Sequence, residues 1–386
     1  MIYETKDLFG RRDLSQIKKE FKYLPLNYVG SKKQLLPWIW ELIEQNGIEF
    51  SSMLDPFSGS GVVSYFMRLL DKTVYSNDLL KSSFYNCVSL VENPGVIVTK
   101  NELEWLASHT VENGVLNDKD FCYDDISHYN EVNFTENFLT LKEAIYIDCL
   151  LYKMKNMKDF FDLTEADVIY KQAICYSALM AFLNLLPFGS AGGSNFLEYR
   201  KRQKDTYNNR CKGFYMDEEY NLHLYWIANY IDKFSKFSLL AKNSPQGKAF
   251  NLNVFEFLNL DYTKDVDLVY FDPPYGGSTS DYSSMYAFLE QFITQDYISE
   301  EKQLQSKNFS LKQYEENFIR LLDCVVDIKY WIFSYNHRSW STIDNISSVV
   351  GKYKRDVRVF TYHSKLQNRG NMTKGKDFSE FLIIAS

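Results

Sequence analysis

The sequence predicts an α/β fold whose mainly parallel sheet is divided along the chain by a mainly helical insertion. At both ends of the 386 residues, short apolar runs alternate with helical stretches, as βαβ units require. The run at 266–271 is rich in β-branched and aromatic residues and is followed by Pro273 and Pro274. Two consecutive prolines exclude both a helix and further strand pairing, so the chain must leave the sheet there.

The first part of the core is expected at residues 1–91. Residues 1–20 are polar and charged, which favours a helical or loosely held leader. The pattern then predicts, in order, a helix at 33–45, a strand at 51–54, a helix at 62–70 and a strand at 73–76. Each strand is short and ends in a turn, so these elements are expected to form parallel βαβ units.

The insertion is expected at residues 92–245 and the second part of the core at 246–386. Apolar residues in the insertion recur with a helical period, most clearly at 138–155 and 166–186. Strand patterns then return at 249–257, 266–271, 330–334, 355–361 and 378–385. No internal repeat and no low-complexity tract interrupts this organisation.

Composition narrows the class of protein. The formal net charge of −7 excludes a generally basic protein that coats nucleic acid, although it allows local basic patches. The six cysteines lack CxxC spacing and do not stand near histidines at ligand spacing, so we expect reduced thiols and no metal site. The N-terminus lacks a signal-peptide apolar region and no run is long enough to span a membrane. A cytoplasmic protein without a membrane partner is expected.

A carboxylate and an aromatic ring stand directly behind the strand at 266–271. The residues are Asp272, Pro273, Pro274 and Tyr275. Ligands of open α/β sheets bind at the carboxyl ends of the strands. A rigid acceptor beside a flat ring suits a planar heterocycle with an exocyclic amine. The alternative is a strand terminator with an incidental tyrosine.

A Gly-rich turn follows the strand at 51–54 and opens the next helix. Its sequence from Asp55 is Asp-Pro-Phe-Ser-Gly-Ser-Gly, and its glycines, Gly59 and Gly61, let a ligand approach the backbone and the helix N-terminus. Asp78 ends the next strand, where nucleotide-binding folds place an acid that accepts from ribose hydroxyls. The alternatives are an ordinary βα connection and an aspartate that caps the next helix.

These motifs, in this order, resemble the S-adenosyl-L-methionine-dependent DNA adenine-N6 methyltransferases of the alpha (Dam-like, D12) class. Tyr-Val-Gly-Ser-Lys at 28–32 resembles the N-terminal cofactor motif, and the turn at 55–61 resembles Asp/Glu-Pro-Phe-x-Gly-x-Gly. The tetrapeptide at 272–275 resembles the catalytic Asp-Pro-Pro-Tyr, and 333–337 resembles the segment that follows it. The resemblance implies a Rossmann-like methyltransferase core carrying a target-recognition insertion.

The resemblance also implies roles for single residues. The methionine part of the cofactor, the ribose and the cofactor adenine would be held by Tyr28, Lys32, Asp55, Phe57, Gly59, Gly61, Asp78 and Phe255. Asp272 and the Pro273 carbonyl would accept hydrogen bonds from the adenine N6 amine, and Pro274 belongs to the same catalytic motif. Tyr275 would stack on the target base. The Phe255 assignment departs from the family pattern, because the expected acid before that phenylalanine is missing here.

The implied reaction is direct transfer of methyl to N6 of an adenine flipped out of duplex DNA, without a metal or a covalent enzyme intermediate. The implied setting is a restriction-modification system with a cognate restriction endonuclease, and a monomeric enzyme. The alternatives are an RNA adenine or cytosine-N4 methyltransferase, and a catalytically silent DNA-binding specificity protein on a methylase fold. Intact Asp272 and Tyr275 argue against the silent protein.

DNA contacts are expected from two basic stretches. The first lies in the insertion and contains Arg200, Lys201, Arg202 and Lys204. The second, at 352–376, contains Arg369 and Lys374. Cations near phosphates supply affinity and salt dependence, whereas contacts to base edges supply sequence choice. The alternative for each stretch is a solvated charged face.

Overall fold

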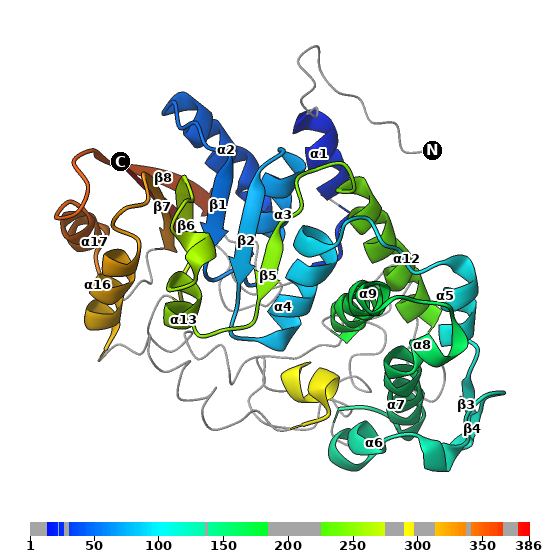
Figure 1. Ribbon diagram of the computed structural model, residues 1–386. Helices are drawn as coiled ribbons and strands as arrows, with labels where there is room; N and C mark the ends of the chain where they lie inside the picture. Colours follow the sequence, from blue (N-terminus) through cyan, green and yellow to red (C-terminus); the bar gives the residue numbers. More distant parts are fainter. Residues whose placement is uncertain are drawn as a thin grey trace.

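The computed structural model describes residues 14–21, 23–26, 31–135, 138–183, 225–274, 289–296, 313–336, 341–365 and 377–386 (Figure 1). Its centre is a seven-stranded sheet with the strand order β5-β2-β1-β6-β7-β9-β8. The strands are β1 (Ser52–Asp55), β2 (Thr73–Asn77), β5 (Lys248–Phe250), β6 (Leu268–Phe271), β7 (Tyr330–Asn336), β8 (Val357–Lys365) and β9 (Asp377–Ala385).

Most of the sheet is parallel. Strands β5, β2, β1, β6 and β7 pair in parallel, and β9 enters between β7 and β8 antiparallel to both. The chain builds outward from β1 through β2 to β5 on one side, and from β6 to β7 on the other. The order therefore reverses between β1 and β6, which is the switch point where open α/β sheets bind ligands. The predicted α/β class with a mainly parallel sheet is confirmed.

Helices cover both faces of this sheet (Figure 1). On one face lie the helices of the first part of the core: α1 (Leu14–Phe21), α2 (Leu36–Gln45), α3 (Val62–Leu69) and α4 (Lys81–Cys87). On the other face lie α13 (Val254–Leu258), α16 (Tyr314–Cys324) and α17 (Ile343–Val350). Successive side chains of a strand point to opposite faces of the sheet, so one strand contributes to both cores. Met53 of β1 packs with the first group of helices and its neighbour Leu54 with the second.

The described part of the predicted insertion is mainly helical. Its helices are α5 (Lys100–Leu106), α6 (Tyr129–Phe134), α7 (Leu141–Lys155), α8 (Met157–Phe160), α9 (Glu165–Leu183) and α12 (Tyr225–Leu240). A two-stranded antiparallel hairpin, β3 (Thr110–Glu112) and β4 (Val115–Asn117), was not expected. Among the described residues, no helix combines the length and apolar character needed to cross a membrane.

Helices α9 and α12 share a continuous hydrophobic core with the sheet. The Tyr65 hydroxyl of α3 donates to the Phe237 carbonyl of α12 at 2.7 Å, and the Arg68 guanidinium donates to the carbonyls of Leu90 and Pro245 at 2.8 and 3.1 Å. Part of the helical segment is therefore integral to the core. The proposed boundaries at 91 and 245 stay a prediction.

The strand predicted at 249–257 is wrong in its second half. Strand β5 ends at Phe250, and α13 begins at Val254. The cause is a reciprocal cap: the Asn253 side chain accepts from the backbone N–H of Phe255 at 2.9 Å, and the Glu256 carboxylate accepts from that of Asn253 at 3.3 Å. Such a capping box starts a helix whatever the apolar alternation suggests.

Candidate active site

The turn between β1 and α3 has the conformation that its glycines allow. Gly59 and Gly61 have φ angles of 52° and 75°, in the left-handed region where side chains are unfavourable. The backbone N–H of Ser58 donates to the Asn77 carbonyl at 2.9 Å, and that of Gly61 donates to the Ser58 carbonyl at 2.7 Å. The turn is thus anchored to the end of β2, and it brings backbone close to the switch point.

Asp55, the last residue of β1, is buried with 1% exposure. Its Oδ2 accepts from the Ser64 hydroxyl at 2.6 Å, and Ser64 in turn accepts from the Ser76 hydroxyl at 3.0 Å. Its Oδ1 is buried and accepts no hydrogen bond of good geometry from the described residues. Burial raises the pKa of Asp55 to about 7, the Ser64 bond opposes that rise, and the charges of Asp272 and Asp78 add to it. Three carboxylates therefore converge near the switch point.

Asp78 directly follows β2 and is half-buried. Its Oδ2 accepts from the backbone N–H of Gly59 at 2.8 Å, and its Oδ1 from that of Leu80 at 2.9 Å. Burial raises the pKa of Asp78 to about 7, against these two hydrogen bonds. The carboxylate thus braces the Gly-rich turn, and its oxygens retain lone pairs for a ligand hydroxyl.

Two asparagines that the sequence did not single out as site residues join the turns of the site. The Asn77 amide donates to the carbonyls of Pro56 and Leu252 at 3.2 and 3.1 Å, so it links the turns after β1 and β5. The Asn251 amide donates to the Asp78 carbonyl at 2.8 Å. An amide side chain carries both donors and an acceptor, so it can form hydrogen bonds with the backbone N–H and carbonyl groups of these turns. Their positions in the sequence could have indicated this role, because each asparagine stands close to a predicted strand.

Asp272 follows β6 and forms an ion pair with Lys32. Lys32 Nζ lies 2.9 Å from Asp272 Oδ2, and the two side chains are 2% and 19% exposed. The structure thus pairs Lys32 with the carboxylate that is predicted to be catalytic, and a contact of Lys32 with the cofactor stays a prediction. Its neighbour Lys33 points elsewhere and donates to the Leu24 carbonyl at 2.7 Å. Pro273 and Pro274 follow Asp272 outside the strand, as predicted.

Glu380 of β9 is a site residue that the sequence did not reveal. It pairs across the sheet with Asn336, at the carboxyl end of β7, and is 8% exposed. Its Oε2 is buried and makes no hydrogen bond within the part of the chain that the structure describes. Burial raises the pKa of Glu380 to about 7, the charge of Lys32 opposes the rise, and that of Asp272 adds to it. Glu380 therefore lies within electrostatic reach of the Lys32–Asp272 pair.

The raised pKa of Glu380 predicts a pH-dependent stability. Its folded value of about 7 exceeds the ordinary value of 4.5, so the folded protein holds this proton more tightly than the unfolded chain. The contribution of Glu380 to the free energy of unfolding therefore falls as pH rises from about 4.5 to about 7. We expect Glu380→Gln to gain stability relative to wild type between pH 5 and pH 8, measured by urea unfolding. If Glu380→Gln and wild type differed by the same free energy of unfolding at pH 5 and at pH 8, the assignment of a raised pKa to Glu380 would be wrong.

Phe57 and Phe255 both lie at the second hydrophobic core, the one that α13, α16 and α17 form with the sheet. Phe57 is half-buried and packs against the second core. Phe255 is 5% exposed, and the Arg320 guanidinium of α16 lies 3.9 Å from its ring centroid. Protein therefore covers one face of the Phe255 ring. Contact of either ring with a cofactor stays a prediction.

Several predicted site residues lie outside the described residues. They are Tyr28, Tyr275, Arg200, Lys201, Arg202, Lys204, Arg369 and Lys374. Their roles stay predictions from the sequence.

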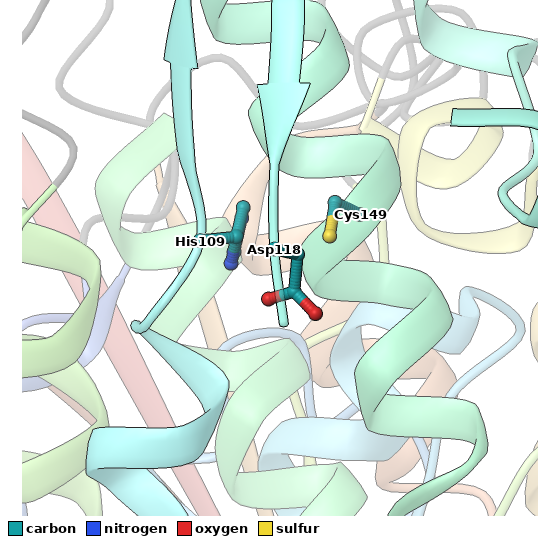
Figure 2. A group of neighbouring side chains, drawn as sticks. All are labelled: His109, Asp118 and Cys149. Atoms are coloured by element: carbon teal, nitrogen blue, oxygen red, sulfur yellow. The ribbon is translucent and has the colours of Figure 1, made fainter. Parts of the chain in front are cut away.

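A second polar cluster lies under the β3–β4 hairpin, away from the sheet (Figure 2). Ligand-type atoms of His109, Asp118 and Cys149 lie within 4.8 Å of one another. However, the buried Lys153 ammonium forms an ion pair with Asp118, and His109 Nε2 lies 2.8 Å from the Tyr146 carbonyl. A fixed positive charge on the carboxylate disfavours a metal ion there. The arrangement fits a structural link between the hairpin and α7.

The geometry of the described site is typical of one class of protein. A Gly-rich turn and carboxylates at the ends of β1, β2 and β6 surround the switch point of a mainly parallel sheet. Open α/β sheets bind their ligands, nucleotide cofactors among them, at such a switch point.

The chain belongs to the family of D12 class N6 adenine-specific DNA methyltransferases, whose family model matches residues 28–346. It is 24% identical to the type II methyltransferase M2.HphI of Haemophilus parahaemolyticus, over 94% of this chain and 98% of that protein. It is 25% identical to the modification methylase StsI of Streptococcus sanguinis, over 93% of this chain and 51% of that protein. It is also 24% identical to the type II methyltransferase M.FokI of Planomicrobium okeanokoites, over 70% of this chain and 37% of that protein.

Proposed function

We propose that this adenine-specific DNA methyltransferase takes its methyl group from S-adenosyl-L-methionine and places it on N6 of an adenine flipped out of duplex DNA. The observation that carries the proposal is the convergence of Asp55, Asp78 and Asp272 around one switch point. We further propose that it modifies a specific site as part of a restriction-modification system, because the relatives include type II methyltransferases. A cytoplasmic monomer with a cognate restriction endonuclease would fit this setting.

The residues after β1 and β2 fit the proposed cofactor. When bound, S-adenosyl-L-methionine supplies a methyl group on a positively charged sulfur. Asp55 offers a buried Oδ1, which accepts no hydrogen bond of good geometry from the described residues, to a cationic or hydrogen-bond-donating group. Asp78 is held by Gly59 and Leu80 with lone pairs left for ribose hydroxyls. The two left-handed glycines let backbone N–H groups approach the ligand.

The Lys32–Asp272 pair supports the chemistry at the acceptor. Adenine N6 is a weak nucleophile because its lone pair is delocalised into the ring. Hydrogen bonds from the N6 amine to Asp272 and to the Pro273 carbonyl favour the pyramidal amine and aim its lone pair. Lys32 holds Asp272 Oδ2 at 2.9 Å, so the carboxylate is oriented before the base arrives. The proton that N6 loses would pass to Asp272 or to solvent.

The substrate class can be tested with labelled methyl donor. Wild-type protein would be incubated with methyl-labelled S-adenosyl-L-methionine and, separately, duplex DNA, single-stranded DNA and RNA of the same sequence. We expect label in duplex DNA above the other two, because the proposed substrate is an adenine flipped out of a specific duplex site. Preferential labelling of RNA would overturn the DNA assignment. No labelling, with donor binding intact, would point to a silent DNA-binding protein.

Charge removal in the insertion tests the DNA surface. Replacing Arg200, Lys201 and Arg202 by alanine should weaken duplex binding and reduce the dependence of log K on log salt by up to about 2.7, at about 0.9 for each phosphate that is no longer neutralised. The measurement is fluorescence anisotropy at several salt concentrations. A matched control is Lys233→Ala with Lys236→Ala, on α12. If the triple variant bound duplex DNA as wild type does, the DNA contacts would be assigned to the second basic stretch, which contains Arg369 and Lys374.

A further inference from the structure

A short helical segment at 289–296 lies between the core and the insertion. Its Glu290 is 3% exposed, and its two carboxylate oxygens accept from the backbone N–H groups of Lys81 at 2.9 Å and Ser82 at 2.7 Å. These groups open α4, whose N-cap residue, Leu80, makes no side-chain capping bond. A carboxylate far away in the sequence therefore supplies the cap that α4 lacks locally.

The start of α4 is also the place that holds Asp78. Asp78 accepts from the N–H of Leu80, and Glu290 accepts from the next two N–H groups along the chain. The charge of Glu290 also contributes to the raised pKa of Asp78. The two carboxylates therefore share one helix start, and a shift of Glu290 would change the backbone to which Asp78 is bound.

The other side of the segment contacts the insertion. The rings of Phe292 and Phe134 stack with centroids 5.4 Å apart. The Gln295 amide donates to Asp148 Oδ1 at 3.0 Å and accepts from Lys155 Nζ at 2.7 Å. Figure 1 shows the segment in yellow, between α4 and the pair α6 and α7. It is thus fixed both to the cofactor side of the core and to the insertion.

We propose that Glu290 is a positioning residue that couples the insertion to the cofactor part of the site. Its carboxylate binds the first two backbone N–H groups of α4, next to the Leu80 N–H that Asp78 binds. The same short segment contacts α6 through Phe292 and α7 through Gln295. This coupling rests on the proposed function, in which Asp78 holds the ribose of the donor and the insertion contacts the DNA.

The test is Glu290→Gln in the full chain. The amide keeps one acceptor but turns an NH2 group toward a backbone N–H, so one of the two capping bonds cannot form. We expect the Kd for S-adenosylhomocysteine, measured by calorimetry, to rise by about 10-fold. We also expect the methyl-transfer rate at saturating donor to fall. Glu290→Ala, which removes both bonds, should show the larger change in Kd.

Glu143→Gln is the matched control. Glu143 is 1% exposed and also caps a helix, accepting from the Thr140 backbone N–H at 3.0 Å, but it lies in α7. We expect this variant to lose comparable stability while the Kd for S-adenosylhomocysteine stays at the wild-type value. Equal Kd values for wild type, Glu290→Gln and Glu143→Gln would overturn the proposal. Wild-type protein that binds S-adenosylhomocysteine but methylates no DNA would refute the proposed function instead, and the Kd comparison would still decide the role of Glu290.

Discussion

Replacing Asp272 by alanine is expected to lower the rate of methyl transfer by at least about 10²–10³-fold, the loss typical of a removed hydrogen-bonding group at a reacting centre. The alanine cannot accept a hydrogen bond from the N6 amine, and it removes the carboxylate that lies 2.9 Å from the Lys32 ammonium. Affinity for duplex DNA should change little, because phosphate contacts supply most of it. Single-turnover transfer and anisotropy binding measure the two quantities separately.

The Asp272→Asn variant distinguishes the role of Asp272 as a hydrogen-bond acceptor from the role of its negative charge. The amide oxygen can still accept one hydrogen bond, so this variant should be less impaired than Asp272→Ala. It also removes the charge that pairs with Lys32. If Asp272→Ala turned over at a near-normal rate, the assignment of Asp272 as the catalytic carboxylate would be wrong.

Replacing Lys32 by methionine should reduce both activity and stability. The Asp272 carboxylate would no longer be held by the Lys32 ammonium at 2.9 Å, and a misplaced acceptor costs about 10²-fold in rate. Removing one member of a fully buried pair costs about 3–5 kcal/mol. Asp272 is 19% exposed, so solvent compensates in part and we expect a loss of about 2–3 kcal/mol in the free energy of unfolding.

Lys33→Met is the matched control for this prediction. Lys33 is the next residue in the chain, but its ammonium donates to the Leu24 carbonyl and not to Asp272. Methyl transfer by this variant should stay within a few-fold of wild type. Equal losses of activity in both lysine variants would indicate that the N-terminal segment acts through its fold and not through the ion pair.

The parts of the site that follow from local signals could be predicted from the sequence. Pro273 and Pro274 end a strand wherever they stand, and glycines after a short strand predict a left-handed turn. Parallel strands place their carboxyl ends at one edge of the sheet, and the structure brings Asp55, Asp78 and Asp272, each predicted to end or follow a strand, within electrostatic reach. These inferences needed only the positions of the strands along the chain and the residue types that follow them.

The remaining parts depend on tertiary contacts that no local pattern reveals. Glu290 caps a helix that begins at Lys81, and Glu380 reaches the site from the last strand of the chain. The Lys32–Asp272 pair joins residues far apart in the sequence, so composition alone could not separate Lys32 from Lys33. The β3–β4 hairpin was missed because its strands span only three residues each, too short for a periodic signal.

The most direct test of the central claim is the chemical identity of the methylated nucleoside. Duplex DNA methylated by wild-type protein with labelled S-adenosyl-L-methionine would be digested to nucleosides and analysed by mass spectrometry, with Asp272→Ala in parallel. The account predicts labelled N6-methyladenine from wild type and none above background from the variant. Labelled N4-methylcytosine, or equal labelling by the Asp272→Ala variant, would contradict it.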